Sequence, residues 1–459
     1  MADISTFAKS KPSGVAWLGD IPKHWEVMRL KFISKVQSSN VDKRSRDDHQ
    51  DVLLCNYTDV YDNEFIDESI EFMESTASQN EINRFLLEEG DVIITKDSES
   101  RDDIAVPALV KNDFNNVLCG YHLAHIRPDS NKLVGEFLFR WLQSQAVNSQ
   151  FEVAANGVTR FGLTLGSIKD SIIAVPPVPE QKKITSLIDW KTGQIDTLIQ
   201  KKYQLLDQLE ENRQALVTQT VTNGLESGKK SKPSGVAWLG DIPKHWEVMR
   251  LKFISKVQSS NVDKRSRDDH QDVLLCNYTD VYDNEFIDES IEFMESTASQ
   301  NEINRFLLEE GDVIITKDSE SRDDIAVPAL VKNDFNNVLC GYHLAHIRPD
   351  SNKLVGEFLF RWLQSQAVNS QFEVAANGVT RFGLTLGSIK DSIIAVPPVP
   401  EQKKIIDFLN KRMEKIDKLE KQVKRGIARM KEYRSTLIDK AVTGDVKVSQ
   451  DRVKYVNKL

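Results

Sequence analysis

The most constraining feature of the sequence is a perfect internal repeat. Residues 9–184 recur without a single difference as residues 230–405, an offset of 221 positions in a chain of 459. Repeats of about 20–50 residues must stack on their neighbours to bury a core, whereas a unit of 176 residues can bury its own. We therefore expect each copy to be a complete globular domain. Such identity arises by recent duplication, by recombination or by engineering.

Electric charge divides along the same boundaries. Each copy carries 20 Lys and Arg residues against 27 Asp and Glu residues, a net charge of −7, while the whole chain carries −9. The segments outside the two copies are therefore net basic. The overall acidity gives no bulk electrostatic indication of a nucleic-acid partner.

The composition is typical of a soluble globular protein, with 40% hydrophobic and 28% charged residues. No stretch approaches the ~18 consecutive apolar residues of a membrane helix, and the N-terminus lacks the apolar centre of a secretory signal. Four cysteines without a Cys-x-x-Cys pair argue against a disulfide framework and against a cysteine-based zinc site. We expect reduced thiols in a cytoplasmic protein.

The two segments outside the copies predict long helices. In 185–229 and 406–459, mostly apolar residues recur at alternating spacings of four and three, in the same register. This spacing is typical of a helix that packs lengthwise on another helix. The first helix is expected over 180–223, a length of about 66 Å. Gly224 and Gly444 are natural stops.

Within one copy the pattern predicts a mixed α/β domain. Short β-rich runs lie at 52–57, 91–95, 104–110 and 172–175, and residues 135–150 have helical spacing. The expected architecture is two globular domains separated by two long antiparallel coiled-coil helices, with approximate internal two-fold symmetry. The domains and helices are assigned to residues 1–184 (first domain), 185–229 (central helix), 230–405 (identical second domain) and 406–459 (C-terminal helix and tail).

No catalytic motif is present. Phosphate-binding, dinucleotide-binding, nucleophile-elbow and zinc-protease motifs are missing, as is the D/N-P-P-Y/F signature of adenine methyltransferases. His122 and His125 have the spacing of a metal pair, but without a third ligand nearby a structural or DNA-facing role is favoured. Asp102 and Asp103 are adjacent and would point apart on a strand, which disfavours a two-metal nuclease. We predict no catalytic residue and no metal site.

Several longer motifs together resemble one protein family. They lie at 13–33 (SGVAWLGDIPKHWEVMRLKFI), 86–95 (LLEEGDVIIT), 156–184 (NGVTRFGLTLGSIKDSIIAVPPVPEQKKI), 215–224 (ALVTQTVTNG) and 436–446 (TLIDKAVTGDV). With these motifs nearly the whole chain resembles the specificity subunit of type I restriction–modification systems. It departs from the usual pattern because its two target-recognition domains are identical, whereas most members carry two different ones.

The resemblance implies a non-catalytic, DNA-binding subunit. Each target-recognition domain would read one half of a bipartite double-stranded DNA target, with the helices setting the gap. Two methyltransferase subunits would dock and methylate an adenine in each half-site, and two restriction subunits can join. S-adenosylmethionine, and ATP with Mg, are expected on these partners only, with no cofactor on this chain. Because identical domains related by a two-fold axis read identical half-sites, the target is predicted to be palindromic.

Candidate base-contacting residues must be polar and lie on loops that reach a groove. Loops 96–101 and 156–160 offer arginines suited to guanine and an asparagine suited to adenine, and Arg160 also suits a phosphate. The first loop also fits an ordinary solvated turn, and an aromatic beside a strand, such as Tyr121, more often belongs to a core. The candidate DNA-binding residues are Lys96, Ser98, Ser100, Arg101, Tyr121, His122, Asn156, Thr159 and Arg160 in the first copy, and Lys317, Ser319, Ser321, Arg322, Tyr342, His343, Asn377, Thr380 and Arg381 in the second.

The acidity of the domains is in tension with DNA binding, because phosphate contacts dominate affinity for DNA. Basic residues concentrated before the acidic stretch 47–81 suggest one basic face, and we hypothesise that the methyltransferase subunits supply most of the phosphate clamp. A rival interpretation is a symmetric protein-interaction scaffold with two identical adaptor domains, which also fits the acidity and the missing motifs. A third, an adenine methyltransferase acting alone, is disfavoured by the missing signatures.

Overall fold

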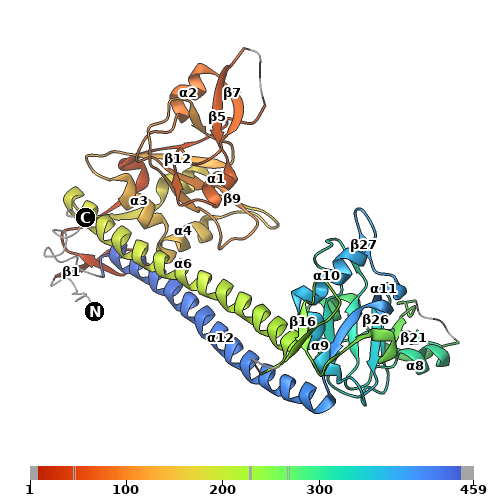
Figure 1. Ribbon diagram of the computed structural model, residues 1–459. Helices are drawn as coiled ribbons and strands as arrows, with labels where there is room; N and C mark the ends of the chain where they lie inside the picture. Colours follow the sequence, from red (N-terminus) through yellow and green to blue (C-terminus); the bar gives the residue numbers. More distant parts are fainter. Residues whose placement is uncertain are drawn as a thin grey trace. The chain divides into compact units, whose positions relative to one another are not determined.

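The computed structural model describes residues 9–44, 46, 48–226, 230–265, 267 and 269–445 (Figure 1). Parts of the assigned domains and helices, including residues 1–8, 227–229 and the tail 446–459, lie outside the described residues. Contacts divide the chain into unit 1, Met1–Lys202 with Arg425–Leu459, and unit 2, Tyr203–Lys424. Each unit therefore contains one globular domain and parts of both long helices.

The domain of unit 1 is built around a mixed five-stranded sheet. In spatial order its strands are β4 (Ser34–Ser38), β12 (Leu123–Pro128), β8 (Val92–Thr95), β10 (Pro107–Val110) and β6 (Phe65–Ile66). Only β6 and β10 are parallel to each other. Successive side chains of β8 alternate between two cores, since Val92 and Ile94 belong to one cluster and Ile93 to another. The central strand is thus buried on both faces, as its continuous apolar run indicates.

One face of this sheet shares its core with a smaller sheet and two short helices. These elements are β11 (Val117–Cys119), β5 (Gln50–Cys55), β7 (Met73–Ala77), α1 (Tyr57–Tyr61) and α2 (Gln79–Phe85). The predicted strand 52–57 ends at Cys55. Asn56 starts α1 instead, because its side chain and that of Asp59 form a capping box.

The other face carries the helices and the two ends of the domain. These elements are α3 (Gly135–Leu142), α4 (Gln145–Ala154), α5 (Leu165–Asp170), η1 (Leu30–Phe32), the hairpin β1 (Ser10–Pro12) with β2 (Asp20–Pro22), and β3 (Glu26–Arg29) paired with β14 (Ile172–Val175). The β3–β14 pair joins the first and last motifs of the copy and confirms the strand predicted at 172–175.

Two predicted elements of this domain have different limits in the structure. The helix expected over 135–150 is two helices, and Ser144 at the break has an extended backbone and accepts a hydrogen bond from Val147 N. The strand expected over 104–110 is confined to β10, because Ala105 has a left-handed backbone with φ +61°. Both breaks come from local backbone geometry that the hydrophobic pattern does not reveal.

The long helices α6 (Val178–Asn223) and α12 (Val399–Thr443) confirm the helix prediction. Both are followed by a glycine with positive φ, Gly224 at +76° and Gly444 at +84°, as expected for stops. At the start of α6, the buried Gln181 accepts a hydrogen bond from Val134 N at 2.9 Å. The helix is therefore fastened to its own domain in the first turn.

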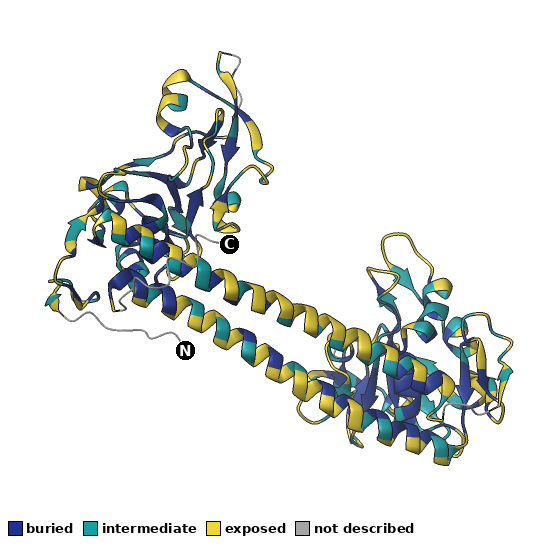
Figure 2. Cartoon of the chain, turned by 60° about the vertical axis from the view of Figure 1, so that its left-hand side comes forward, coloured by how far each residue is buried: buried dark blue, intermediate teal, exposed yellow. Residues whose placement is uncertain are grey.

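Within unit 1 the start of α6 and the end of α12 run antiparallel. Asp196 of α6 accepts a hydrogen bond from Arg434 of α12, and further along α6 Lys202 packs on Gly426. The residue numbers of the contacts thus increase along α6 while they decrease along α12. Ile188 of α6 and Ile438 of α12 belong to the same core cluster of the domain. In this unit, Ile188, Ile195 and Ile199 of the predicted seam are buried, and Figure 2 shows dark-blue patches along both long helices.

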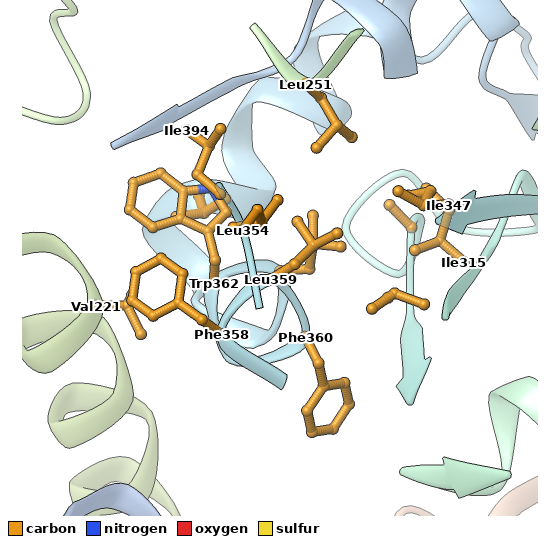
Figure 3. Close-up of a cluster of buried hydrophobic side chains, with 14 of the residues drawn as sticks. Val221, Leu251, Ile315, Ile347, Leu354, Phe358, Leu359, Phe360, Trp362 and Ile394 are labelled. Atoms are coloured by element: carbon orange, nitrogen blue, oxygen red, sulfur yellow. The ribbon is translucent and has the colours of Figure 1, made fainter. Parts of the chain in front are cut away.

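Unit 2 repeats this architecture with the second copy. Its elements are β15 (Ser231–Pro233), β16 (Asp241–Pro243), β17 (Glu247–Arg250), η2 (Leu251–Phe253), β18 (Ser255–Ser259), β19 (Gln271–Cys276), α7 (Tyr278–Tyr282), β20 (Phe286–Ile287), β21 (Met294–Ala298), α8 (Gln300–Phe306), β22 (Val313–Thr316), β23 (Asp318–Ser319), β24 (Pro328–Val331), β25 (Val338–Cys340), β26 (Leu344–Pro349), α9 (Gly356–Gln364), α10 (Gln366–Ala375), β27 (Phe382–Gly383), α11 (Leu386–Asp391) and β28 (Ile393–Val396). Figure 3 shows Val221 from the end of α6 beside Phe358 and Trp362 of α9 in the core.

Candidate nucleic-acid interface

Three loops that carry the predicted DNA-binding residues meet at one end of the unit 1 domain. The backbone of Lys96 links two of them, since its N–H donates to His122 O at 3.0 Å and its O accepts from Leu163 N at 2.8 Å. The short strand β9 (Asp97–Ser98) then pairs with β13 (Phe161–Gly162). Residues distant in sequence are thus held together by the backbone. We call the side chains of the predicted DNA-binding residues on these three loops the reading cluster.

The loop between Asn156 and Gly162 is a tight hairpin. Two backbone hydrogen bonds close it, Asn156 N to Gly162 O at 3.0 Å and Gly162 N to Asn156 O at 2.8 Å. Gly157 has φ +135°, and a Cβ at this position would lie 1.9 Å from Arg160 O. Only glycine fits there. The hairpin exposes Asn156, Thr159 and Arg160 to solvent, as base-contacting residues require.

Aromatic rings and cations lie together in the reading cluster. Tyr121 is half-exposed, with Lys96 Nζ 5.7 Å from its ring centroid. The guanidinium of Arg101 lies 5.0 Å from the centroid of the Phe161 ring. Cations held over ring faces keep a defined position while remaining near solvent. The arrangement combines positive charge with a flat surface, which suits phosphate contact and base stacking.

His122 is oriented by an acidic neighbour. Its Nδ1 lies 2.6 Å from Asp97 Oδ2, and its ring packs edge-on against Tyr121 at a centroid distance of 4.0 Å. The carboxylate accepts the hydrogen bond, so Nδ1 carries the hydrogen and a neutral ring offers Nε2 as an acceptor. The backbone of His122 is left-handed, with φ +72°. Such strained backbone in a non-glycine residue is concentrated at functional sites.

The structure adds four residues that the sequence analysis missed: Tyr57, Tyr61, Asp97 and Phe161. The rings of Tyr57 and Tyr61 stack at 5.6 Å, and Tyr61 donates a hydrogen bond to Asp103 at 2.5 Å. That bond raises the pKa of Tyr61 to about 12. Burial and the charge of Asp103 raise the pKa of Tyr57. The i, i+4 spacing of the two tyrosines would have predicted that their rings are neighbours, but only if their segment had been recognised as a helix.

Some candidate residues have local structural roles. Ser98 is buried, and its hydroxyl accepts a hydrogen bond from Ser100 N, so its side chain shapes the turn instead of facing solvent. Ser100 and Arg101 are exposed. Asp102 and Asp103 lie in a turn and not on a strand as expected, where Asp102 bonds to Ser100 and Asp103 to Tyr61. Both carboxylates are engaged by hydroxyl groups.

The second histidine of the GYHLAHIRPD motif has a structural role. His125 is buried, and its Nε2 lies 2.7 Å from Asp91 Oδ2. Arg127 also holds this carboxylate, through its Nε at 2.8 Å and its Nη2 at 2.7 Å. Burial would raise the pKa of Asp91, but the hydrogen bonds from Arg127 and His125 lower it below its usual range. Within the described part of the chain, no three His, Cys, Asp or Glu side chains gather as a metal site.

Two of the basic residues that precede the acidic stretch are paired with one carboxylate. Arg29 and Lys31 both contact Asp170, with N–O distances of 3.0 and 2.7 Å. This pairing neutralises part of their charge. The cations that remain near the reading cluster are Lys96, Arg101 and Arg160.

Unit 2 has the same cluster at the corresponding positions. His343 Nδ1 lies 2.5 Å from Asp318 Oδ2, and Lys317 Nζ lies 5.8 Å from the ring centroid of Tyr342. Figure 1 shows the hairpin that leads into β27 standing clear of the rest of this unit. The remaining members are Ser319, which is buried, and Ser321, Arg322, Asn377, Thr380 and Arg381, which are exposed.

The chain thus has two mixed α/β domains with the same cluster of polar and aromatic side chains, each followed by a long helix. The family described as "Type I restriction modification DNA specificity domain" matches residues 22–210 and 243–429. The chain belongs to this family, and it is a specificity subunit of a type I restriction–modification system. The resemblance stated from the sequence is thereby confirmed. No helix among the described residues is long and apolar enough to span a membrane.

Curated relatives are similar over most of this chain. The putative type I restriction enzyme MjaX specificity subunit of Methanocaldococcus jannaschii is 22% identical over 98% of this chain and all of its own length. The EcoKI specificity subunit of Escherichia coli K12 is 23% identical, over 78% of this chain and 75% of its own.

Two solved structures share the fold. A chain from a study of complex assembly and conformational transition of the type I R-M system has a TM-score of 0.69 and 16% identity, covering 93% of this chain and 99% of its own. The HsdS subunit from Thermoanaerobacter tengcongensis has a TM-score of 0.52 and 18% identity, covering 93% and 98%. The mixed α/β fold class with two repeated domains and long helices is thereby confirmed.

Proposed function

We propose that each domain of this chain reads one half of a palindromic, gapped double-stranded DNA sequence through its reading cluster. The observation that supports this proposal is the recurrence of the same residues in the same geometry in both units, in a chain of the DNA-specificity family. Identical clusters read identical base sequences. The half-sites are therefore the same sequence on opposite strands if the units are related by a two-fold axis.

In this proposal the chain performs no chemistry and acts in the cytoplasm. The absence of catalytic motifs from the sequence supports a purely recognising role. Two methyltransferase subunits carry S-adenosylmethionine and methylate an adenine in each half-site, and restriction subunits with ATP and Mg can join them. The acidity of each domain supports a division of labour in which these partners supply most of the phosphate contacts.

The decisive experiment is methylation mapping. The chain is expressed with its neighbouring methyltransferase, and the DNA of the cells is read by long-read sequencing that detects N6-methyladenine. We expect one new methylated motif, gapped and palindromic. Two unlike half-sites would overturn the symmetry argument, and no new motif would favour the protein-interaction scaffold.

A second experiment tests the reading cluster itself. Arg160→Ala combined with Arg381→Ala removes an exposed arginine from each hairpin. Loss of one arginine–base contact costs about 1–3 kcal/mol, so specific affinity should fall by about 30-fold or more over two half-sites while non-specific affinity falls far less. The matched control is Arg84→Ala with Arg305→Ala, which removes exposed arginines from α2 and α8. Equal losses of specific and non-specific affinity would reduce Arg160 to a phosphate contact.

A further inference from the structure

The hairpin of the reading cluster presents an apolar side chain at its tip. Val158 is 91% exposed and Val379, its counterpart, is 90% exposed. The neighbouring hairpin residues Asn156, Thr159 and Arg160 are polar and also exposed. An isolated exposed valine needs no explanation on an ordinary surface. Here it occupies the tip of a loop whose other side chains are suited to contact bases.

The hairpin also holds this valine in a fixed place. The two hydrogen bonds between Asn156 and Gly162 close the loop, and Gly157 adopts a backbone that other residues cannot take. Valine itself is stiff, because its branched Cβ strongly restricts χ1. A rigid apolar group on a rigid loop loses little conformational entropy when it is buried against a partner.

Only one base offers an apolar group in the major groove. Thymine carries a C5 methyl there, whereas the other edges present hydrogen-bond donors and acceptors. We infer that Val158 and Val379 read a thymine in each half-site by contact with its methyl group. This inference rests on the proposed function, and it adds a specificity-determining residue that hydrogen-bonding criteria overlook.

The test removes the methyl group from the DNA and the valine from the protein. The full chain in complex with its methyltransferase is titrated with target duplexes in which each thymine of the half-sites is replaced, position by position, by uracil, which lacks only the C5 methyl. Burial of one methyl group corresponds to about a four-fold change in affinity. We expect this loss at one thymine position of each half-site, and about 15-fold when both half-sites are substituted.

The variant Val158→Ala with Val379→Ala should bind the thymine and uracil duplexes equally well. The matched control is Val153→Ala with Val374→Ala, which removes valines of 86% and 85% exposure from α4 and α10, outside the hairpin. This control should keep the wild-type preference for thymine.

Three results would overturn the inference while leaving the proposed function intact. They are a target motif without thymine in its half-sites, equal binding of both duplexes by the wild-type complex, and an undiminished thymine preference in the Val158→Ala, Val379→Ala variant. A complex without any sequence-specific binding would instead overturn the proposed function, and this inference with it.

Discussion

Removal of Gln181 should weaken the junction between the domain and the helix in unit 1. It is fully buried and makes three hydrogen bonds: its Oε1 accepts from Val134 N, and its Nε2 donates to Lys132 O and Pro176 O, each of these two at 2.7 Å. All three partners are backbone groups of the domain or of the turn that leads into α6. The Gln181→Ala variant therefore leaves one backbone donor and two acceptors without a partner.

The expected cost follows from this count. A hydrogen bond contributes about 1 kcal/mol net, and leaving a buried partner unsatisfied costs about 1–3 kcal/mol, so the free energy of unfolding of unit 1 should fall by about 3 kcal/mol. For a unit of this size each kcal/mol lowers Tm by about 2–4 °C, which gives about 6–12 °C. Differential scanning calorimetry of the full chain should show a separate transition at lower temperature.

Matched variants test the reasoning. Gln181→Met keeps the side-chain volume but not the hydrogen bonds, so it should lose nearly as much stability as Gln181→Ala. Gln200→Ala changes an exposed residue of the same helix and should stay within about 0.5 kcal/mol of wild type. Gln402 makes the same three bonds in unit 2. A Tm shift under about 2 °C for Gln181→Ala would refute the argument.

Two further predictions concern acid stability and the hairpin. The pKa values of Asp91 and Asp312 are lowered in the folded protein, so the two carboxylates stabilise it above the unfolded pKa of about 4, and this stabilisation is lost as pH falls through the lower folded values. The variant Asp91→Asn with Asp312→Asn should therefore lower Tm at pH 7 and flatten the decline of Tm below pH ~4. A decline as steep as that of the wild type would contradict this prediction. Gly157→Ala with Gly378→Ala should cut specific DNA affinity at least about ten-fold, because a Cβ collides with the hairpin backbone. Binding assays should show this loss of affinity while circular dichroism shows that the variant is still folded. Unchanged affinity would exclude a rigid hairpin.

The sequence predicts the large elements of this protein because their signals are long or repeated. The perfect repeat predicts two domains, and the spacing of apolar residues predicts helices that the structure places at Val178–Asn223 and Val399–Thr443. Short elements carry no long or repeated signal of this kind. A capping box at Asn56 and Asp59 lies where the predicted strand gives way to α1, and the extended backbone of Ser144 separates α3 from α4. Each boundary depends on the local conformation of one or two residues.

The candidate site shows the same limit in another form. Loop position and residue type were enough to select Lys96, Tyr121 and Arg160, but pairing of β9 with β13 was needed to show that their segments meet. Asp97 was overlooked because its role is to orient His122, a relation between residues 25 positions apart. Sequence patterns indicate which side chains suit DNA, while the contacts that orient them emerge only from the fold.

The two domains are identical in sequence but do not have identical surroundings, because the helices differ. In unit 1 the buried Arg140 donates two hydrogen bonds to Asp189 of α6, at 3.0 and 2.7 Å. In unit 2 its counterpart Arg361 meets Asn410 of α12 through one bond at 3.2 Å, its Nε has no partner, and burial lowers its pKa.

This difference is confined to the side of each domain that contacts the helices. In the reading clusters, the histidine–aspartate distances are 2.6 and 2.5 Å, and the lysine–tyrosine distances are 5.7 and 5.8 Å. The two helices therefore hold their domains through different hydrogen bonds, while the side chains of the two clusters keep the same geometry. Under the proposed function, two domains that are held differently by their helices can therefore still read identical half-sites of a palindromic target.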